Sequence, residues 1–307
     1  IVSDGSKPDC GRLFFLFGNN VSVAVQDPAY PVYVDGSVMI GATGNYNSNS
    51  EEFDGVEYLR CTAENDFFPD LSKAKRTDLI YFCSPNNPTG AVATKEQLKE
   101  LVDFARKNKS IIIFDAAYSE FISEENLPRS IFEIEGAREC AIEVSSLSKP
   151  AGFTGVRLGW TIVPKELKFD DGESVGKDWQ RVMGTLFNGS SNVAQWGAIA
   201  ALSETGLSEI RETVSYYMEN AKIIKDGLEG LGIKTFGGVN SPYIWASFPG
   251  KKSWDVFEDI LTKAHVVTTP GAGFGKAGEG YVRFSAFGNT SDIKEAVKRL
   301  EENLEHF

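Results

Sequence analysis

The first half of the chain repeats short apolar runs that are rich in β-branched and aromatic residues. The runs are VSVAVQ (21–26), LIYFCS (79–84), SIIIFDA (110–116), CAIEVSSLS (140–148) and LGWTIV (158–163). Most of them lack the alternation of apolar and polar residues that is typical of a strand with one face in water. The pattern therefore predicts strands that are covered on both faces, as in a mostly parallel sheet.

The segment 94–108, TKEQLKELVDFARKN, has the periodicity of a helix. One face carries apolar residues at the i, i+3, i+4, i+7 spacing, namely Leu98, Leu101, Val102 and Ala105. Thr94 is a suitable N-cap. Because this helix lies between two predicted strands, the three elements form a βαβ unit, and we expect an α/β fold.

The pattern changes after about residue 205. Before it, a long helical stretch is predicted from about residue 179 to 203, and the polar stretch 45–55 is predicted to be a surface loop. After it, helices over about 207–231, from about 253 and at the chain end accompany the strand-like GYVRFSAF (280–287). We expect a large domain over residues 1–205 and a smaller α+β lobe over residues 206–307.

Charge and composition exclude several classes of function. Asp and Glu number 43 against 31 Lys and Arg, and the net charge of −12 argues against a nucleic-acid partner. No apolar run approaches the length of a membrane span, so we expect no membrane partner. The two histidines, His265 and His306, disfavour a Ser-His-Asp triad and a metal site. The four cysteines form no C-x-x-C pair, which favours a reducing compartment.

Lys149 directly follows a predicted buried strand, in SLSKPAGFTGVRLGW (146–160). An unpaired ammonium group is costly to bury, so the position calls for an explanation. One interpretation is a polar loop. The other is a lysine whose amine bonds to the aldehyde of pyridoxal 5′-phosphate. That cofactor would also need a phosphate cradle, an acid near its pyridine nitrogen and a donor to its ring hydroxyl.

The chain offers groups for the phosphate cradle. Ser146 and Arg157 flank Lys149 and could bind a phosphate through a hydroxyl and a guanidinium group. The segment 5–7, Gly-Ser-Lys, lies at a predicted helix start, where free N–H groups favour an anion.

Candidates for the ring contacts follow other predicted strands. Asp115 ends the run 110–116, at the edge where open α/β sheets bind ligands, and Tyr118 lies three residues later. Asn87, in SPNNPTG, could donate to a ring hydroxyl. Each residue alone has an ordinary structural explanation, such as a cap or a turn. Together, polar groups at or near the ends of several apolar runs favour a pyridoxal-phosphate site.

The glycine-rich stretch GAGFGKAGEG (271–280) resembles a phosphate-binding loop at first sight. It does not fit the P-loop pattern, and a strand rather than a helix follows it. We therefore interpret it as a flexible loop and not as a nucleotide site.

These residues resemble the class I/II aminotransferases of fold type I, and the segment 146–159 fits the lysine signature of that class. The chain is more similar still to the LL-diaminopimelate aminotransferase family, over essentially its whole length. The similar segments are VSDG, VAVQDP, FFPDLS, FCSPNNPTG, PRSIFEI, GFTGVRLGW, FNG, SWDVF, VVTTPG and SAFG. SKPDCGRL, NGSSN and GAGFGKAGEG differ in detail, and Pro150 stands where we expect an aromatic residue.

The resemblance implies a large domain with a mostly parallel sheet, a smaller C-terminal lobe, and a role for each candidate residue. Lys149 would be the covalent lysine and proton carrier, and Asp115 would pair with the pyridine nitrogen. The other implied ring contacts are Tyr30, Asn87 and Tyr118, of which Tyr30 stacks on the ring. The implied phosphate ligands are Ser6, Lys7, Ser146 and Arg157. The implied ligands of a substrate carboxylate are Asn188 and Arg283.

The resemblance also implies an activity. The implied enzyme would transfer an amino group between L,L-2,6-diaminopimelate and 2-oxoglutarate, giving tetrahydrodipicolinate and glutamate. This reaction is a step of lysine biosynthesis. Two alternatives stay open: a related aminotransferase that acts on lysine or another amino acid, and a cofactor-binding protein that has lost turnover.

The resemblance implies a homodimer with shared active sites, in a bacterial cytoplasm or a plastid stroma. The chain begins IVSDG without an initiator Met, and we expect it to be truncated at the N-terminus relative to that family.

Overall fold

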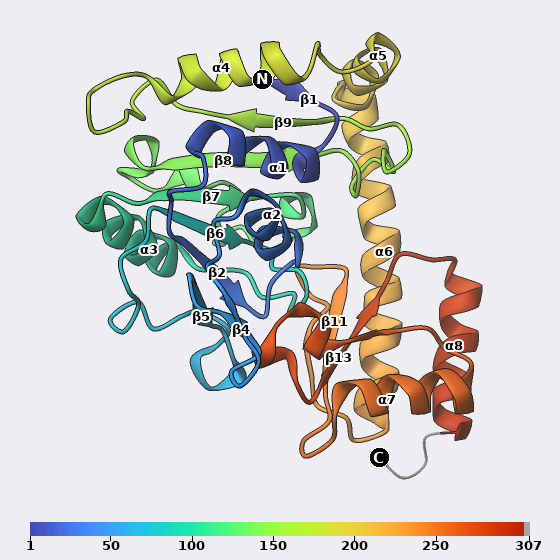
Figure 1. Ribbon diagram of the computed structural model, residues 1–307. Helices are drawn as coiled ribbons and strands as arrows, with labels where there is room; N and C mark the ends of the chain where they lie inside the picture. Colours follow the sequence, from blue (N-terminus) through green and yellow to red (C-terminus); the bar gives the residue numbers. More distant parts are fainter. Residues whose placement is uncertain (304–307) are drawn as a thin grey trace.

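The computed structural model describes residues 1–303 and contains a seven-stranded sheet at its centre (Figure 1). In sheet order the strands are β1 (Val2–Ser3), β9 (Gly159–Ile162), β8 (Ala141–Ser146), β7 (Ile111–Asp115), β6 (Leu79–Cys83), β2 (Val23–Asp27) and β5 (Val56–Arg60). The strands from β8 to β5 run parallel, and β9 and β1 pair antiparallel at one edge. The five predicted strands and the mostly parallel sheet are confirmed.

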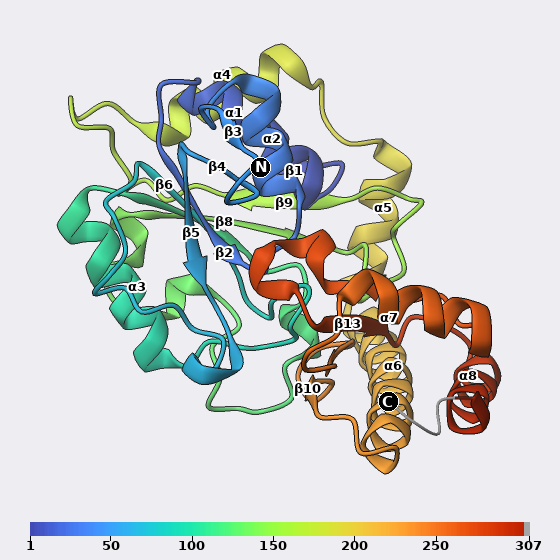
Figure 2. The same cartoon turned by 60° about the horizontal axis from the view of Figure 1, so that its bottom comes forward.

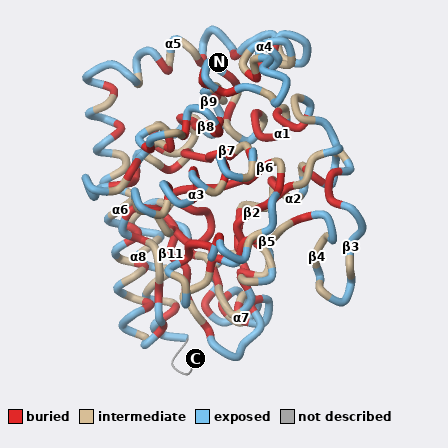
Figure 3. Tube along the Cα trace, turned by 90° about the vertical axis from the view of Figure 1, so that its left-hand side faces the viewer, coloured by how far each residue is buried: buried red, intermediate tan, exposed pale blue. Residues whose placement is uncertain are grey.

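Helices cover both faces of this sheet, which explains the continuous apolar runs. In β6, Tyr81 and Cys83 pack on the face covered by α1 (Ser6–Phe17), α2 (Val32–Ile40) and α4 (Val175–Leu186). The alternate residues Ile80 and Phe82 pack on the other face, against α3 (Lys95–Asn108). Figure 3 shows the resulting buried layer between the exposed outer turns of the helices.

The helix α3 is the one predicted over 94–108. Its four predicted apolar residues are all buried, and Thr94 is its N-cap. The helical stretch predicted over about 179–203 is not one helix, because the chain forms two helices there, α4 and α5 (Asn192–Ala201). The polar segment 188–191, Asn-Gly-Ser-Ser, lies between them, and Gly189 adopts φ 109°, which a helix cannot continue through.

A second sheet of four antiparallel strands accompanies the C-terminal helices (Figure 2). Its strands, in order, are β10 (Thr235–Gly237), β11 (Tyr243–Ser247), β13 (Tyr281–Ser285) and β12 (Thr269–Pro270). It shares a core with α6 (Glu204–Gly230), α7 (Ser253–Asp259) and α8 (Thr290–Asn303). The division into residues 1–205 and 206–307 stays a prediction; its boundary falls in the first turn of α6.

The glycine-rich stretch 271–280 is not a loose loop. It forms two short 3₁₀ turns, Gly271–Phe274 and Lys276–Gly278, and Phe274 is buried. The backbone N–H of Ala277 donates to the carboxylate of Asp27 at 3.1 Å, and the N–H of Ala29 donates to the Phe274 carbonyl at 2.8 Å. This stretch therefore joins the small sheet to the end of β2.

Two further points concern the periphery. The predicted surface loop 45–55 contains a small hairpin, β3 (Tyr46–Asn47) and β4 (Glu52–Phe53). No helix among residues 1–303 combines the length and the apolar character needed to cross a bilayer.

Candidate active site

A cavity of about 330 Å³ lies at the carboxyl ends of β6, β7 and β8. The loops that follow parallel strands begin at this edge, and open α/β sheets bind their ligands there. Of the predicted site residues, the cavity is lined by Ser6, Lys7, Tyr30, Asn87, Asp115, Tyr118, Ser146, Lys149, Arg157 and Arg283. The fold thus brings together residues that are up to 277 positions apart in the sequence.

One end of the cavity is built to hold an anion. It contains the first residues of α1, Ser6 and Lys7, together with Ser148 and Arg157. The N-cap residue Gly5 makes no side-chain cap, so amides of the first turn stay available to a ligand. A Cβ at Gly5 would lie 2.5 Å from Arg157 Nη2, so glycine is required for the guanidinium to approach the helix start.

The segment around Lys149 orients this end. Ser146 Oγ donates to Ser148 Oγ at 2.8 Å, and Arg157 Nη1 donates to Ser148 Oγ at 3.3 Å. Arg157 itself adopts a left-handed backbone conformation with φ 68°, and its Nη1 also donates to the Thr154 carbonyl at 2.8 Å. An arginine in this sparsely populated region points to a functional constraint on its side chain.

The other end of the cavity presents the carboxylate of Asp115, which is buried. Its Oδ2 accepts a hydrogen bond from the Tyr33 hydroxyl at 2.7 Å, and its Oδ1 accepts one from the Ala117 N–H at 3.1 Å. Burial raises the pKa of Asp115, and these two hydrogen bonds act in the opposite direction. A cationic N–H group facing this carboxylate would be strongly favoured.

Lys149 lies between the two ends, in a turn three residues past β8. Burial lowers the pKa of its amine, and the nearby positive charges of Arg283 and Arg157 lower it further. Its Nζ lies 5.1 Å from the centre of the Phe287 ring, and no hydrogen bond from it is recorded within residues 1–303. Such an amine is more readily neutral, and hence nucleophilic, than an exposed lysine.

The small sheet contributes two residues to the cavity. Arg283, on β13, donates through Nη1 to Asn87 Oδ1 at 2.6 Å, and its guanidinium lies 4.5 Å from the centre of the Tyr243 ring. Tyr243, on β11, shares a hydrogen bond of 2.7 Å with the hydroxyl of Tyr118. The accepted bond fixes the Asn87 amide so that its Nδ2 is free to donate elsewhere.

Asn188 is the one predicted site residue that does not line the cavity. It is exposed, in the segment between α4 and α5. Sequence reasoning missed Tyr33, Cys83, Ala117, Ser148, Thr154 and Tyr243, which do line it. Tyr33 lies one helical turn after Tyr30 and Ser148 lies in the lysine segment, so both had a local signal; Tyr243 had none beyond its strand pattern.

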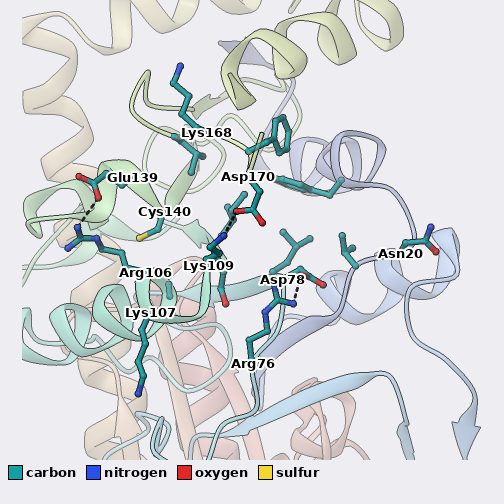
Figure 4. Close-up of a pocket in the computed structure, with 18 residues that line it drawn as sticks. Asn20, Arg76, Asp78, Arg106, Lys107, Lys109, Glu139, Cys140, Lys168 and Asp170 are labelled. Atoms are coloured by element: carbon teal, nitrogen blue, oxygen red, sulfur yellow. Dashed lines mark hydrogen bonds and ion pairs between the residues drawn. The ribbon is translucent and has the colours of Figure 1, made fainter. Parts of the chain in front are cut away.

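A larger cavity of about 760 Å³ lies at the opposite edge of the sheet, at the amino ends of β6 and β7 (Figure 4). None of the predicted site residues lines it. Its charged groups largely pair with one another, as Arg76–Asp78 at 2.5 Å, Arg106–Glu139 at 2.9 Å and Lys109–Asp170 at 3.1 Å. Lys107 and Lys168 point away from these pairs in Figure 4. Both lysines are exposed, so this cavity lacks a partly buried lysine flanked by converging donors, as Lys149 is in the first cavity.

The residues of the first cavity fit pyridoxal 5′-phosphate. Hydroxyl, amide and guanidinium donors converge at one end, where a phosphate would bind. A buried carboxylate stands at the other end, where a pyridinium nitrogen would bind, and the amine of Lys149 lies between them. The fit rests on the chemistry of these groups and on the space that Gly5 leaves beside Arg157.

Comparisons with known proteins agree with this geometry. The family model described as aminotransferase class I and II matches residues 1–300. The chain is 56% identical over 301 residues to the chloroplastic LL-diaminopimelate aminotransferase of Arabidopsis thaliana, which covers 98% of this chain and 65% of that relative. It is 55% identical over 303 residues to the LL-diaminopimelate aminotransferase of Protochlamydia amoebophila (strain UWE25), covering 99% of this chain and 74% of the relative.

A solved structure is similar over the same extent. The L,L-diaminopimelate aminotransferase from Chlamydomonas reinhardtii superposes with a TM-score of 0.96 at 58% sequence identity, covering 98% of this chain and 74% of that one. The predicted fold type I architecture is thereby confirmed. The chain spans slightly less than two thirds of the length of the Arabidopsis relative. The family match, the identities and the shared fold together establish that this chain belongs to the class I and II aminotransferases.

Proposed function

We propose that this protein is a pyridoxal-phosphate-dependent aminotransferase. It would interconvert L,L-2,6-diaminopimelate and 2-oxoglutarate with tetrahydrodipicolinate and glutamate. The observation that carries the proposal is the position of the Lys149 amine, between an anion-binding end and the buried carboxylate of Asp115. The pKa of this amine is lowered by its surroundings. The names of the relatives, which are more than half identical to this chain, support the choice of substrate.

The residues of the cavity would hold the cofactor from three sides. Ser6, Lys7, Ser146 and Arg157 would hold the phosphate, together with the amides of the first turn of α1. Asp115 would face the pyridine nitrogen, Asn87 and Tyr118 the ring hydroxyl, and Tyr30 one face of the ring. When bound, pyridoxal 5′-phosphate supplies an aldehyde that accepts amines and a ring that takes up electrons from the substrate Cα.

Lys149 has two tasks in this proposal. Its neutral amine would hold the cofactor through the cofactor's aldehyde. Its Nζ would also be the base that takes up the proton of the substrate Cα and carries it. Proton transfer by a positioned base typically contributes about 10²- to 10⁴-fold to the rate. The carboxylate of Asp115 would stabilise a protonated pyridine nitrogen.

Arg283 would bind the α-carboxylate of each substrate as a bidentate pair. Its guanidinium already lies at the cavity, stacked against Tyr243 and bonded to Asn87. Asn188 is a second candidate for a substrate carboxylate. Because it is exposed and lies outside the cavity of its own chain, we assign it to the site of a partner subunit.

We propose a homodimer with shared active sites. The helix α5, which follows Asn188, exposes a stripe of apolar side chains with exposed fractions of 81% for Val193, 71% for Trp196 and 61% for Ile199. Large exposed apolar stripes usually mark an interface. A monomeric mass in sedimentation equilibrium at micromolar concentration would contradict this part of the proposal.

The compartment is proposed on chemical grounds and from the relatives. The four cysteines are free and buried, which suits a reducing compartment. One relative is described as chloroplastic and another belongs to a bacterium, so a plastid stroma or a bacterial cytoplasm are the two candidates.

The decisive experiment is borohydride reduction of the protein with pyridoxal 5′-phosphate, followed by peptide mass analysis. We expect the cofactor on Lys149 in the wild type and on no lysine in Lys149→Ala. Assays with L,L-2,6-diaminopimelate and with lysine, each with 2-oxoglutarate, then separate the substrate alternatives. Covalent cofactor with no turnover on either would favour the protein that has lost activity, whereas labelling at another lysine would refute the assignment.

A further inference from the structure

Asp115 is held by a side chain that comes from a separate helix. The Tyr33 hydroxyl, on α2, donates to Asp115 Oδ2 at 2.7 Å, while the second oxygen takes the Ala117 N–H at 3.1 Å. Within residues 1–303 these are the hydrogen bonds recorded to this carboxylate. One donor on each oxygen fixes the plane of the carboxylate and leaves lone pairs directed at the cavity.

Tyr33 is itself rigidly placed. It is 1% exposed, and its ring stacks on that of Tyr81 with a centroid distance of 5.0 Å and an interplanar angle of 17°. Tyr30 packs against its edge at 6.0 Å. Packing of this kind leaves the hydroxyl little freedom to point elsewhere, so the donor is already in position before a ligand arrives.

Besides Tyr33, the titratable groups that interact electrostatically with Asp115 supply no charge at neutral pH. They are Cys10 on α1, Cys83 on β6 and Tyr118 after β7, and burial raises the pKa of each. Thiols and phenols with raised pKa values stay protonated, so none of them neutralises the carboxylate. Among the described residues, Tyr33 is the side chain that donates a hydrogen bond directly to this carboxylate, and that bond offsets part of the cost of burying the charge. The cationic side chains of the same cavity, such as Lys149, have no recorded bond to it.

We propose that Tyr33 is the positioning residue of Asp115, whose hydrogen bond orients the carboxylate and favours its anionic form. Only an anionic Asp115 can stabilise a protonated pyridine nitrogen. The effect of the Tyr33 hydrogen bond on turnover therefore rests on the function proposed above. The hydrogen bond itself is a property of the chain and can be tested without turnover.

The chain offers a matched control in Tyr81. Its hydroxyl is also buried, in the same aromatic stack, but it has no hydrogen-bond partner within the described residues. Tyr33→Phe and Tyr81→Phe each remove one buried hydroxyl and keep the ring. An effect on Asp115 that comes from packing alone would appear in both variants, whereas an effect of the hydrogen bond would appear only in Tyr33→Phe.

The test is a ¹³C NMR pH titration of the full chain labelled at the aspartate carboxyl carbon, before and after addition of pyridoxal 5′-phosphate. The signal of Asp115 is identified by its loss in Asp115→Asn. We expect Tyr33→Phe to raise the midpoint of Asp115 in the cofactor-free chain by about one pH unit or more, and Tyr81→Phe to move it by less than about 0.3 units. With cofactor and active enzyme, kcat should fall in Tyr33→Phe with little change in KM.

An unmoved Asp115 midpoint in Tyr33→Phe, or an equal shift in Tyr81→Phe, would overturn the proposal. Should Tyr33→Phe not fold, 3-fluorotyrosine at position 33 serves instead, because fluorine makes the phenol a stronger donor. The Asp115 midpoint should then fall, and a rise or no change would count against the proposal. The titration remains decisive even if the protein turns over neither amino acid, so it is independent of the proposed activity.

Discussion

Arg283 reaches from the small sheet to the large one, where its guanidinium donates to Asn87. Its Nε is buried with no hydrogen-bond partner among the described residues, and its Nη2 donates to Thr269 Oγ1 at 3.3 Å. Each Nη atom carries a second N–H beyond these bonds, so the guanidinium at the cavity keeps donors for another acceptor. At the scale of single residues, these Nη donors are the feature that most favours a carboxylate ligand.

Arg283→Lys should weaken binding of amino-acid substrates and dicarboxylate inhibitors by at least about tenfold, or roughly 1.4 kcal/mol. Lysine keeps the charge but cannot form the planar bidentate pair. Cofactor affinity should hardly change, because Arg157 faces the phosphate end. Titrations of wild type and variant with cofactor and with substrate check this, and loss of cofactor binding with intact substrate binding would reverse the two arginine assignments.

Asp115→Asn should retain the cofactor but lower kcat by at least about tenfold, since a neutral amide cannot hold the ring nitrogen protonated. Spectrophotometric titration and steady-state assays measure the two effects. Activity within about threefold of the wild type would show that Asp115 does not have the proposed role.

The same variant also makes a prediction for cofactor-free stability. Burial raises the pKa of Asp115 above its ordinary value of 3.8. Its contribution to stability is therefore present at low pH and is lost as the pH rises through the raised value. Asparagine does not titrate and has no such loss. The free energy of unfolding of Asp115→Asn should therefore rise relative to that of the wild type as the pH increases from about 4 to about 7. Urea unfolding at the two pH values tests the sign.

At the scale of elements, α3 carries the clearest local signals. Thr94 Oγ1 accepts from the Gln97 N–H at 3.2 Å, and Gln97 Oε1 accepts from the Thr94 N–H at 2.9 Å, which completes a capping box. The helix also packs its four buried apolar residues on β6 and β7. The predicted and observed helix agree here, because the N-cap and the buried face both depend on the spacing of residues a few positions apart.

Thr94→Ala should lower the free energy of unfolding by about 1 kcal/mol, as N-cap removals do. Thr213→Ala is the control, because Thr213 lies inside α6 and is only partly buried, with its hydroxyl bonded back to the Glu209 carbonyl. Alanine is the better helix former there, so that variant should be neutral or slightly stabilising. Equal losses in both variants, measured by denaturant unfolding, would contradict the capping role.

At the scale of the whole molecule, Asp27 joins the two sheets. It ends β2, pairs with Arg60 of β5, and accepts the Ala277 N–H from the glycine-rich turns of the small lobe. A Cβ at Gly275 would collide with Asp27 Oδ1, and Gly275 adopts φ 126°, so glycine is required at this contact. The junction helps to place β13, and with it Arg283, over the large sheet.

Asp27→Asn should destabilise the fold by about 2 kcal/mol, because a charge-assisted hydrogen bond and an ion pair whose carboxylate is buried are weakened together. Glu52→Gln is the control: Glu52 also pairs with Arg60, but on the surface hairpin, where such pairs contribute about 0–1 kcal/mol. Denaturant unfolding of both variants distinguishes them, and a loss in Glu52→Gln as large as in Asp27→Asn would assign the effect to Arg60 alone.

The local spacing of residues determined much of this protein. Continuous apolar runs predicted the buried parallel strands, and the i, i+3, i+4 pattern predicted α3. Positions at or near strand ends singled out Asn87, Asp115, Lys149 and Arg157, which line the cavity. These features depend on hydrogen bonding and burial over a few residues, so they can be recognised in the amino-acid sequence alone. The segment 188–191 shows the limit, since a helix-like pattern on both sides concealed a break.

Only the tertiary structure decided which distant residues meet. Nothing local marks Tyr33 as the partner of Asp115, Tyr243 as the partner of Tyr118, or Asn87 as the acceptor of Arg283. The glycine-rich stretch reads as flexible until Asp27, some 250 residues earlier, is placed against it. Such contacts depend on how α2 and the small sheet pack on the large sheet, and packing of that range is set by the whole core rather than by any short segment.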